Sequence, residues 1–124
     1  MKESMKVMIV DDEEDLITTL VERLEIRGFD VVGLQTGQQA IEQLKQRSFD
    51  VVVLDVKLKG EDGVEVMKLI KHDHPTLPVI LLSGHMSQES SEEGFRAGAI
   101  DYLIKPINIE DLIKKLQEAV KVYG

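Results

Sequence analysis

The chain of 124 residues contains no cysteine, so disulfide frameworks and thiolate chemistry are both excluded. It also lacks any apolar run near the roughly 18 residues that a membrane-spanning helix requires. The N-terminal letters MKESMK lead into a strand-length segment without a cleavage site, so we expect no signal peptide. Together these absences predict a cytoplasmic protein that has no membrane partner.

Basic residues are also scarce: the chain has 15 Lys and Arg residues but 23 Asp and Glu residues, so the formal net charge is -8. This balance argues against binding of nucleic acid or of an anionic membrane by the domain itself, because both require a basic face. Solubility alone could account for the acid. However, five carboxylates occupy residues 11–15, directly after the apolar run 7–10. Such crowding raises the pKa of each carboxyl group unless a cation is present.

The length suits one domain, and we expect residues 1–124 to form it. No linker, repeat or low-complexity tract interrupts the sequence. The hydrophobic content of 43% is enough for a core without a metal or disulfide staple. A chain of this size buries about two-thirds of its unfolded surface.

Short apolar runs alternate with amphipathic segments along the whole chain. The runs are residues 7–10, 30–34, 51–54, 79–82 and 100–104, and the amphipathic segments centre on residues 16–26, 40–44, 64–70, 88–97 and 109–120. Continuous apolar runs are typical of strands that are covered on both faces. The pattern therefore predicts an α/β fold, in which five βα units form a parallel sheet with helices on both faces. Five such strands commonly take the order 2-1-3-4-5.

Acidic residues end two strands that this order makes neighbours. The first strand is followed by Asp11 and Asp12, and the third ends at Asp55. Adjacent strands lie about 5 Å apart, so the three carboxylates should converge on one crevice at the carboxyl edge of the sheet. A cluster of this kind is costly without a compensating positive charge. Hard oxygen ligands with access to water suit Mg²⁺, with Mn²⁺ as a substitute.

The two remaining strand ends supply complementary groups. The fourth strand ends at Ser83, which offers a hydroxyl, and the fifth ends at Lys105, which offers an ammonium. A carboxylate nucleophile, a metal, a hydroxyl donor and a cation are the groups that phosphoryl transfer requires.

These segments resemble the receiver domain of response regulators in two-component signalling, of the kind found in chemotaxis regulators. The matching pieces are VDDEEDL, LDVKLKGEDGVEVM, LPVILLSGH and GAIDYLIKP, and they cover nearly the whole chain in that order. The resemblance implies a flavodoxin-like three-layer sandwich. It also implies a switch that is not an enzyme in the usual sense, because it assists only its own phosphorylation and dephosphorylation.

The same resemblance implies a role for each site residue. Asp55 would accept a phosphoryl group from a sensor histidine kinase or a histidine phosphotransfer protein. Asp11, Asp12, Asp55 and the backbone carbonyl of Lys57 would bind the metal, and Ser83 and Lys105 would contact the phosphoryl group. Tyr102 would be a switch aromatic that moves inward when Ser83 shifts, and Pro106 would follow a cis peptide bond. Lys57 and His85 would tune dephosphorylation.

On this resemblance, phosphorylation remodels the face formed by the fourth helix, the fifth strand and the fifth helix, and so controls an output domain or a target protein. The resemblance leaves open whether the domain forms a homodimer on phosphorylation. Two departures from the family pattern stand out. Lys59 occupies a position that is often proline, and Gly94 replaces a common alanine, which should weaken the fourth helix by about 1 kcal/mol.

Less specific interpretations remain for these residues. Asp11 and Asp12 are also suited to capping the first helix, although Asp55 and Lys105 favour a metal site. Glu13, Glu14 and Asp15 are better interpreted as first-turn helix charges than as metal ligands. Ser83 could be an ordinary loop residue, Lys105 could be solvated, and Tyr102 could be a static core residue.

Other function classes are less compatible with the sequence. A haloacid-dehalogenase-type phosphatase has a second Asp two residues after its nucleophile, where this chain has Lys57. An FMN carrier would need a phosphate loop where the acidic run lies, and no P-loop motif is present. A receiver-like module that binds partners without phosphorylation is a further alternative.

Overall fold

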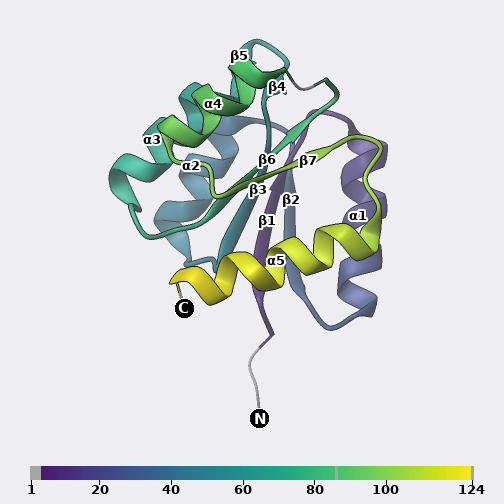
Figure 1. Cartoon of the computed structure of the whole chain (residues 1–124). Coiled ribbons are helices and arrows are strands. Elements are labelled where there is room, and N and C mark those ends of the chain that lie inside the picture. The colour runs from purple at the N-terminus through teal and green to yellow at the C-terminus, as the bar shows by residue number, and fades with distance from the viewer. Residues whose placement is uncertain (1–3, 86, 124) are drawn as a thin grey trace.

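A parallel five-stranded sheet forms the centre of the molecule in the computed structural model, which describes residues 4–85 and 87–123. Its strands stand in the order β2-β1-β3-β6-β7 (Figure 1). They are β1 (Lys6–Val10), β2 (Asp30–Leu34), β3 (Val51–Asp55), β6 (Val79–Ser83) and β7 (Asp101–Ile104). All four strand pairings are parallel. Strands β6 and β7 are the fourth and fifth strands of this sheet along the chain. The predicted α/β fold and its 2-1-3-4-5 strand order are therefore confirmed.

One helix follows each of these strands along the chain. The helices are α1 (Glu14–Ile26), α2 (Gly37–Gln46), α3 (Gly63–Asp73), α4 (Gln88–Ala97) and α5 (Ile109–Tyr123). The loop after β3 also contains a two-residue hairpin, β4 (Lys57–Leu58) paired with β5 (Glu61–Asp62), which the sequence pattern did not predict. Lys59 lies in its turn, beside Gly60 at a φ of 74°. Glycine adopts this left-handed conformation at low cost.

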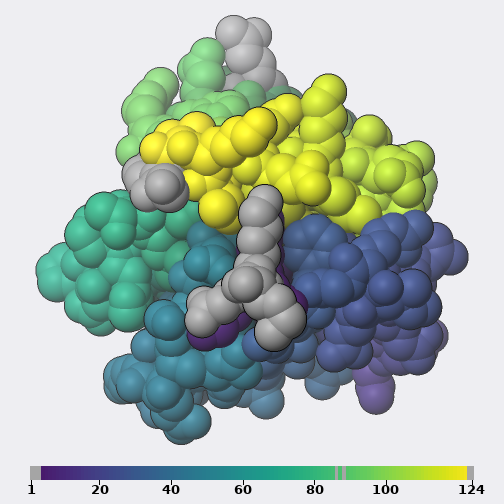
Figure 2. All heavy atoms as spheres, turned by 90° about the horizontal axis from the view of Figure 1, so that it is seen from below, coloured from purple at the N-terminus to yellow at the C-terminus, as the bar shows by residue number. Residues whose placement is uncertain are grey.

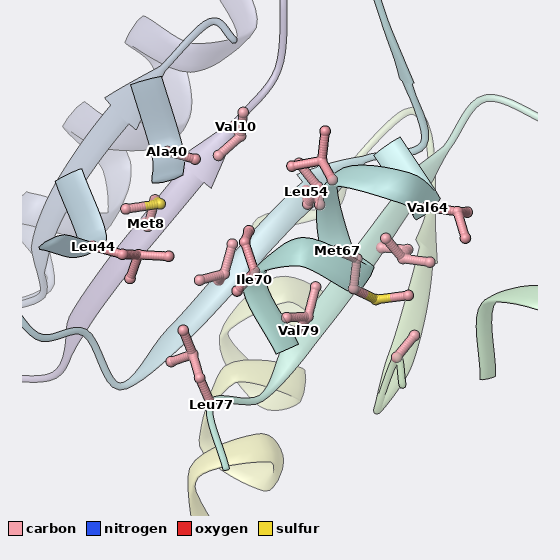
Figure 3. Close-up of a cluster of buried hydrophobic side chains, with 14 of the residues drawn as sticks. Met8, Val10, Ala40, Leu44, Leu54, Val64, Met67, Ile70, Leu77 and Val79 are labelled. Carbon is pink, nitrogen blue, oxygen red and sulfur yellow. The ribbon is translucent and has the colours of Figure 1, made fainter. Parts of the chain in front are cut away.

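The helices cover both faces of the sheet, and each face has its own hydrophobic core (Figure 1). On one face, α1 and α5 contribute Ile17, Leu20, Leu24, Leu112 and Leu116. On the other, α2 and α3 contribute Ala40, Leu44, Met67 and Ile70, which converge on the strand residues Met8, Val10, Leu54 and Val79 (Figure 3). The central strand β3 is buried along its whole length, which explains its unbroken apolar sequence.

Seen from below, the yellow C-terminal segment lies against the dark blue segment of the N-terminal third (Figure 2). An ion pair of 3.6 Å between Arg27 and Glu110 links the same two parts of the chain. Among residues 4–85 and 87–123, no helix is long and apolar enough to cross a membrane. The strands begin at this lower end, so their carboxyl ends, where the acidic residues lie, are at the top of Figure 1.

Candidate functional site

The register of the sheet sets Asp11 beside Asp55. Val10, the last residue of β1, pairs with Leu54 of β3, and an aspartate directly follows each of these two residues in the chain. The carboxylates of these two residues and of Asp12 each place an oxygen within 4.8 Å of the others. Asp11 and Asp55 are buried, and the side chain of Asp12 is more open to solvent. The three acids that were predicted to converge thus share one pocket.

Lys105 provides the positive charge of this pocket. Its ammonium nitrogen lies 2.8 Å from Asp11 Oδ2 and 2.9 Å from Asp55 Oδ2. The backbone N–H of Lys105 donates to the carbonyl of Ser83 at 2.8 Å, which fixes the end of β7 against the end of β6. The Lys105–Pro106 peptide bond is cis.

A third carboxylate also contacts this ammonium. Glu13 Oε1 lies 2.9 Å from Lys105 Nζ, although the Glu13 side chain is 61% exposed. Glu13 is thus the N-cap residue of α1 and also pairs with Lys105 at the end of β7, a contact that the sequence did not predict. The acidic run contained the residue, but the contact depends on how far β7 lies from the first loop, which sequence spacing does not give.

Burial and ion pairing both alter proton affinity in the pocket. Burial raises the pKa of Asp11, although the close contact with the Lys105 ammonium opposes this shift. Burial alone would lower the pKa of Lys105, but its close contacts with the carboxylates of Asp11, Asp55 and Glu13 outweigh burial and raise it. The ammonium is therefore charged at neutral pH, and it partly offsets the cost of crowding the acids.

Each buried aspartate uses one oxygen to hold its own loop. Asp11 Oδ1 accepts a hydrogen bond from the Glu13 N–H, and Asp55 Oδ1 accepts one from the Lys57 N–H, both at 2.9 Å. The other oxygen of each faces Lys105. Asp11 thus stabilises the turn into α1 as well as contributing to the pocket, while the N-cap residue Glu13 makes no side-chain capping bond. Both roles considered for Asp11 are compatible in one geometry.

The start of α3 lies directly against the backbone of Asp55. A Cβ atom on Gly63 would come within 2.1 Å of the Asp55 carbonyl oxygen. The Gly63 N–H donates to the carbonyl of Val56 at 2.8 Å. The absence of a side chain at this position therefore allows the close approach of α3 to the end of β3.

A hollow of about 730 Å³ adjoins the pocket on the side of α4. Its lining includes Asp55, Lys57, Ser83, His85 and Tyr102. The Ser83 hydroxyl donates to the carbonyl of His85, and the His85 N–H donates back to Ser83 Oγ at 3.2 Å. Ser83 thus lines the same hollow as Asp55, but its hydroxyl is hydrogen-bonded within its own loop. Lys57 and His85 also line this hollow.

Tyr102 points into the molecule and is only 7% exposed. Its hydroxyl donates to the carbonyl of Ser90 in α4 at 2.9 Å. Its ring meets Phe95 edge to face, with the ring centres 5.2 Å apart. Burial, and then the charge of Glu93, raise the pKa of the phenol.

The donor set fits Mg²⁺. Three carboxylates converge, and one of them, Asp12, is open to the water that this ion retains. Asp11 Oδ2 is fully buried and lies against the Lys105 ammonium, but it has no directed hydrogen-bond partner among the described residues. Asp11, Asp12 and Asp55 would therefore hold the ion. The carboxylate of Asp55 could at the same time act as a nucleophile. This arrangement suits chemistry on a phosphoryl group.

Comparison with known proteins agrees with this geometry. Residues 7–117 match the response regulator receiver domain. The chain is 35% identical over 118 residues to the transcriptional regulatory protein ZraR of Escherichia coli O157:H7, covering 95% of this chain and 27% of ZraR. It is 31% identical over 117 residues to the DNA-binding transcriptional regulator NtrC of Escherichia coli K12, covering 94% of this chain and 25% of NtrC. The chain thus spans about a quarter of the length of these relatives.

A solved structure gives the same answer for the fold. The CheY-like response regulator receiver domain protein from Methanospirillum hungatei JF-1 has a TM-score of 0.91 at 27% identity, covering 97% of this chain and 96% of that one. The predicted family is confirmed by a match that extends from β1 into α5. The chain belongs to the response regulator receiver domains of two-component signalling.

Proposed function

We propose that this domain is a phosphoacceptor switch in which Asp55 takes a phosphoryl group from a phosphohistidine. The donor would be a sensor histidine kinase or a histidine phosphotransfer protein. One observation carries the proposal: Asp55 is 4% exposed, is paired with Lys105 at 2.9 Å, and lies in one pocket with Asp11 and Asp12.

The transfer step requires only the phosphohistidine, Asp55 and one proton from the buffered solvent. A carboxylate oxygen of Asp55 forms a bond to phosphorus while the phosphorus–nitrogen bond to the donor imidazole breaks. The imidazole keeps the electron pair of that bond and takes up the solvent proton to become neutral histidine, and Asp55 becomes an acyl phosphate. Mg²⁺ held by Asp11, Asp12, Asp55 and the Lys57 carbonyl would screen the negative charge of the incoming group.

The residues around Asp55 have separable tasks in this scheme. The Lys57 N–H fixes Asp55 Oδ1, so Oδ2 is the oxygen left facing Lys105. The Lys105 ammonium can follow the new negative charge once Asp55 is modified. Ser83 would have to release the carbonyl of His85 before its hydroxyl could reach the phosphoryl group. This exchange would couple Asp55 to the loop before α4.

The output is inferred from the relatives. ZraR and NtrC are named as transcriptional regulators, and this domain matches about a quarter of each. We propose that phosphorylation remodels the face of α4, β7 and α5, and that this face controls an output domain or a target protein. Moving such a switch from about 1:99 to 99:1 requires roughly 5.5 kcal/mol of differential stabilisation.

The decisive experiment is incubation with acetyl phosphate, with and without Mg²⁺, followed by intact mass measurement. We expect a gain of one phosphoryl group that requires the metal and is absent in Asp55→Asn. Asp73→Asn is the matched control, because this exposed residue ends α3 at the opposite end of the sheet. No gain in the natural chain would overturn the proposal in favour of a phosphorylation-independent binding module. Sustained turnover of a phosphomonoester would instead favour a phosphatase.

A further inference from the structure

The hydroxyl of Tyr102 occupies the place where most residues at position 94 would have a side chain. A Cβ atom on Gly94 would lie 1.6 Å from the Tyr102 hydroxyl oxygen and 2.6 Å from Cζ. It would also approach Leu81 Cδ1 at 3.0 Å. The two distances to Tyr102 are far below any van der Waals contact. The observed position of Tyr102 therefore requires glycine at this point of α4.

Ser83, by contrast, uses its hydroxyl within its own loop, where it donates to the carbonyl of His85. Tyr102 is nevertheless buried and bonded to the carbonyl of Ser90. The ring of Tyr102 is thus inward while the Ser83 hydroxyl is bonded within its own loop.

We propose that Gly94 positions Tyr102 inward in the unphosphorylated domain, so that the sequence of α4, rather than phosphorylation, sets the aromatic part of the switch. The role of Gly94 as a gap for Tyr102 stands on geometry alone. Its regulatory meaning rests on the proposed function. Phosphorylation would then act on Ser83 and its loop against an aromatic ring that is already in place.

A methyl group at position 94 should displace Tyr102 rather than unfold the domain. The atoms in conflict are at the far end of a tyrosine side chain, which can leave by rotation about its first side-chain bond. Alanine is also a better helix former than glycine, so the substitution favours α4 itself. Gly94→Ala therefore separates the position of Tyr102 from the integrity of the fold.

The test measures how accessible Tyr102 is to nitration by tetranitromethane, followed by mass spectrometry. The chain has two tyrosines, so a Tyr123→Phe background makes Tyr102 the single reporter. In metal-free buffer we expect slow nitration, and an increase of about tenfold in Gly94→Ala, which corresponds to about 1.4 kcal/mol in the burial equilibrium. Gly84→Ala is the matched control, because a Cβ there meets nothing within 4 Å, and it should leave the rate unchanged. Equal rates in Gly94→Ala and its parent would overturn the proposal.

A second arm repeats the measurement after treatment with acetyl phosphate and Mg²⁺, with phosphoryl gain checked by mass. The parent should stay slow in both states, because Tyr102 is already inward. Fast nitration at rest that slows on phosphorylation would show an ordinary switch and refute the inference. If no phosphoryl group is gained, only the proposed function fails, since the metal-free comparison does not depend on it.

Thermal unfolding gives an independent check. In a Tyr102→Ala background the conflict with the ring is absent, so Gly94→Ala should raise the Tm through its helix propensity. With Tyr102 present, the same substitution should raise the Tm less or lower it, and this coupling is what a double-mutant cycle measures. The same change of Tm in both backgrounds would contradict a direct contact between positions 94 and 102.

Discussion

The ammonium of Lys105 lies within 2.9 Å of oxygens from three carboxylates that differ greatly in exposure. Asp11 and Asp55 are buried, and Glu13 is open to solvent. Coulombic attraction near a protein surface is weakened by water and salt, whereas a buried charge that loses its partner is strongly destabilised. The same Lys therefore takes part in two kinds of ion pair with different energetic consequences.

Replacing Lys105 should consequently cost more than replacing Glu13. We expect Lys105→Met to lower the free energy of unfolding by about 3 kcal/mol in metal-free buffer, because two buried carboxylates lose their cation. Glu13→Gln should cost under about 1 kcal/mol, as is usual for an exposed pair. Urea denaturation of both variants checks this ranking, and equal losses would argue against it.

Lys57 and His85 line the hollow beside Asp55. On the proposed function, their side chains would control the approach of water to the acyl phosphate of Asp55. We expect Lys57→Ala and His85→Ala to change the lifetime of the phosphorylated form more than its rate of formation. The decay of the phosphorylated mass after removal of acetyl phosphate reports this, and identical lifetimes in the natural chain and both variants would remove the idea.

The pKa of Tyr102 is raised from 10.0, chiefly by burial, so the fold favours the neutral phenol. A group whose pKa is raised by folding contributes stability below its unfolded pKa and loses it as pH rises through the folded value. The natural chain should therefore lose stability above about pH 10 relative to Tyr102→Phe, which has no such proton. Urea midpoints of the two proteins at pH 8 and pH 10.5 test this, and parallel curves would count against a buried phenol.

At the scale of elements, α4 and α5 differ in how they are attached to the sheet. Helix α5 places Leu112, Leu116 and Ala119 in the core. Helix α4 is polar, and Gly94 is its only buried position among those whose burial is described. An element with few buried apolar contacts opens locally at a lower free energy.

We expect backbone amides of α4 to exchange with solvent faster than those of α5 in the native, unphosphorylated domain. Hydrogen exchange followed by mass spectrometry of the two peptides provides the measurement. Exchange in α4 that is no faster than in α5 would mean that its contacts through Tyr102 and Ser90 hold it more firmly than its sequence indicates.

The sequence predicted the main elements because continuous apolar runs mark the strands and amphipathic periodicity marks the helices. The helix boundaries were less clear, since α1 begins at Glu14, ahead of its first apolar residue. The β4–β5 hairpin was not predicted, because two-residue strands have no period. Gly94 was interpreted only as a weak point of α4, since nothing along the chain shows that Tyr102 of β7 fills the space beside it.

On the scale of the whole molecule, the predicted pocket follows from topology. The order of the strands brings Asp11 to Asp55, and the pairing of β6 with β7 brings Lys105 to Ser83. Strand order was therefore sufficient to assemble the site from residues far apart in the chain. It was not sufficient for the orientation of the Ser83 hydroxyl or the reach of Glu13, which depend on side-chain rotation rather than on topology.

Binding of a divalent ion at one end of the sheet should stabilise the molecule as a whole. A ligand that binds only the folded state adds about 2.7 kcal/mol at 100 times its dissociation constant. We expect Mg²⁺ to raise the urea midpoint of the natural chain but not that of Asp12→Ala. Glu14→Ala, in the first turn of α1, is the control that should respond like the natural chain. Equal responses from all three would place the ion elsewhere.

The contact between Gly63 and the carbonyl of Asp55 has a consequence for sequence variation. Even a methyl group at position 63 would meet main-chain atoms, which cannot rotate away as a side chain does. Any accepted replacement would have to move the whole of α3 or the peptide that carries Asp55, the proposed phosphoacceptor. This glycine should therefore be among the least replaceable positions of the chain, although it carries no chemical group of its own.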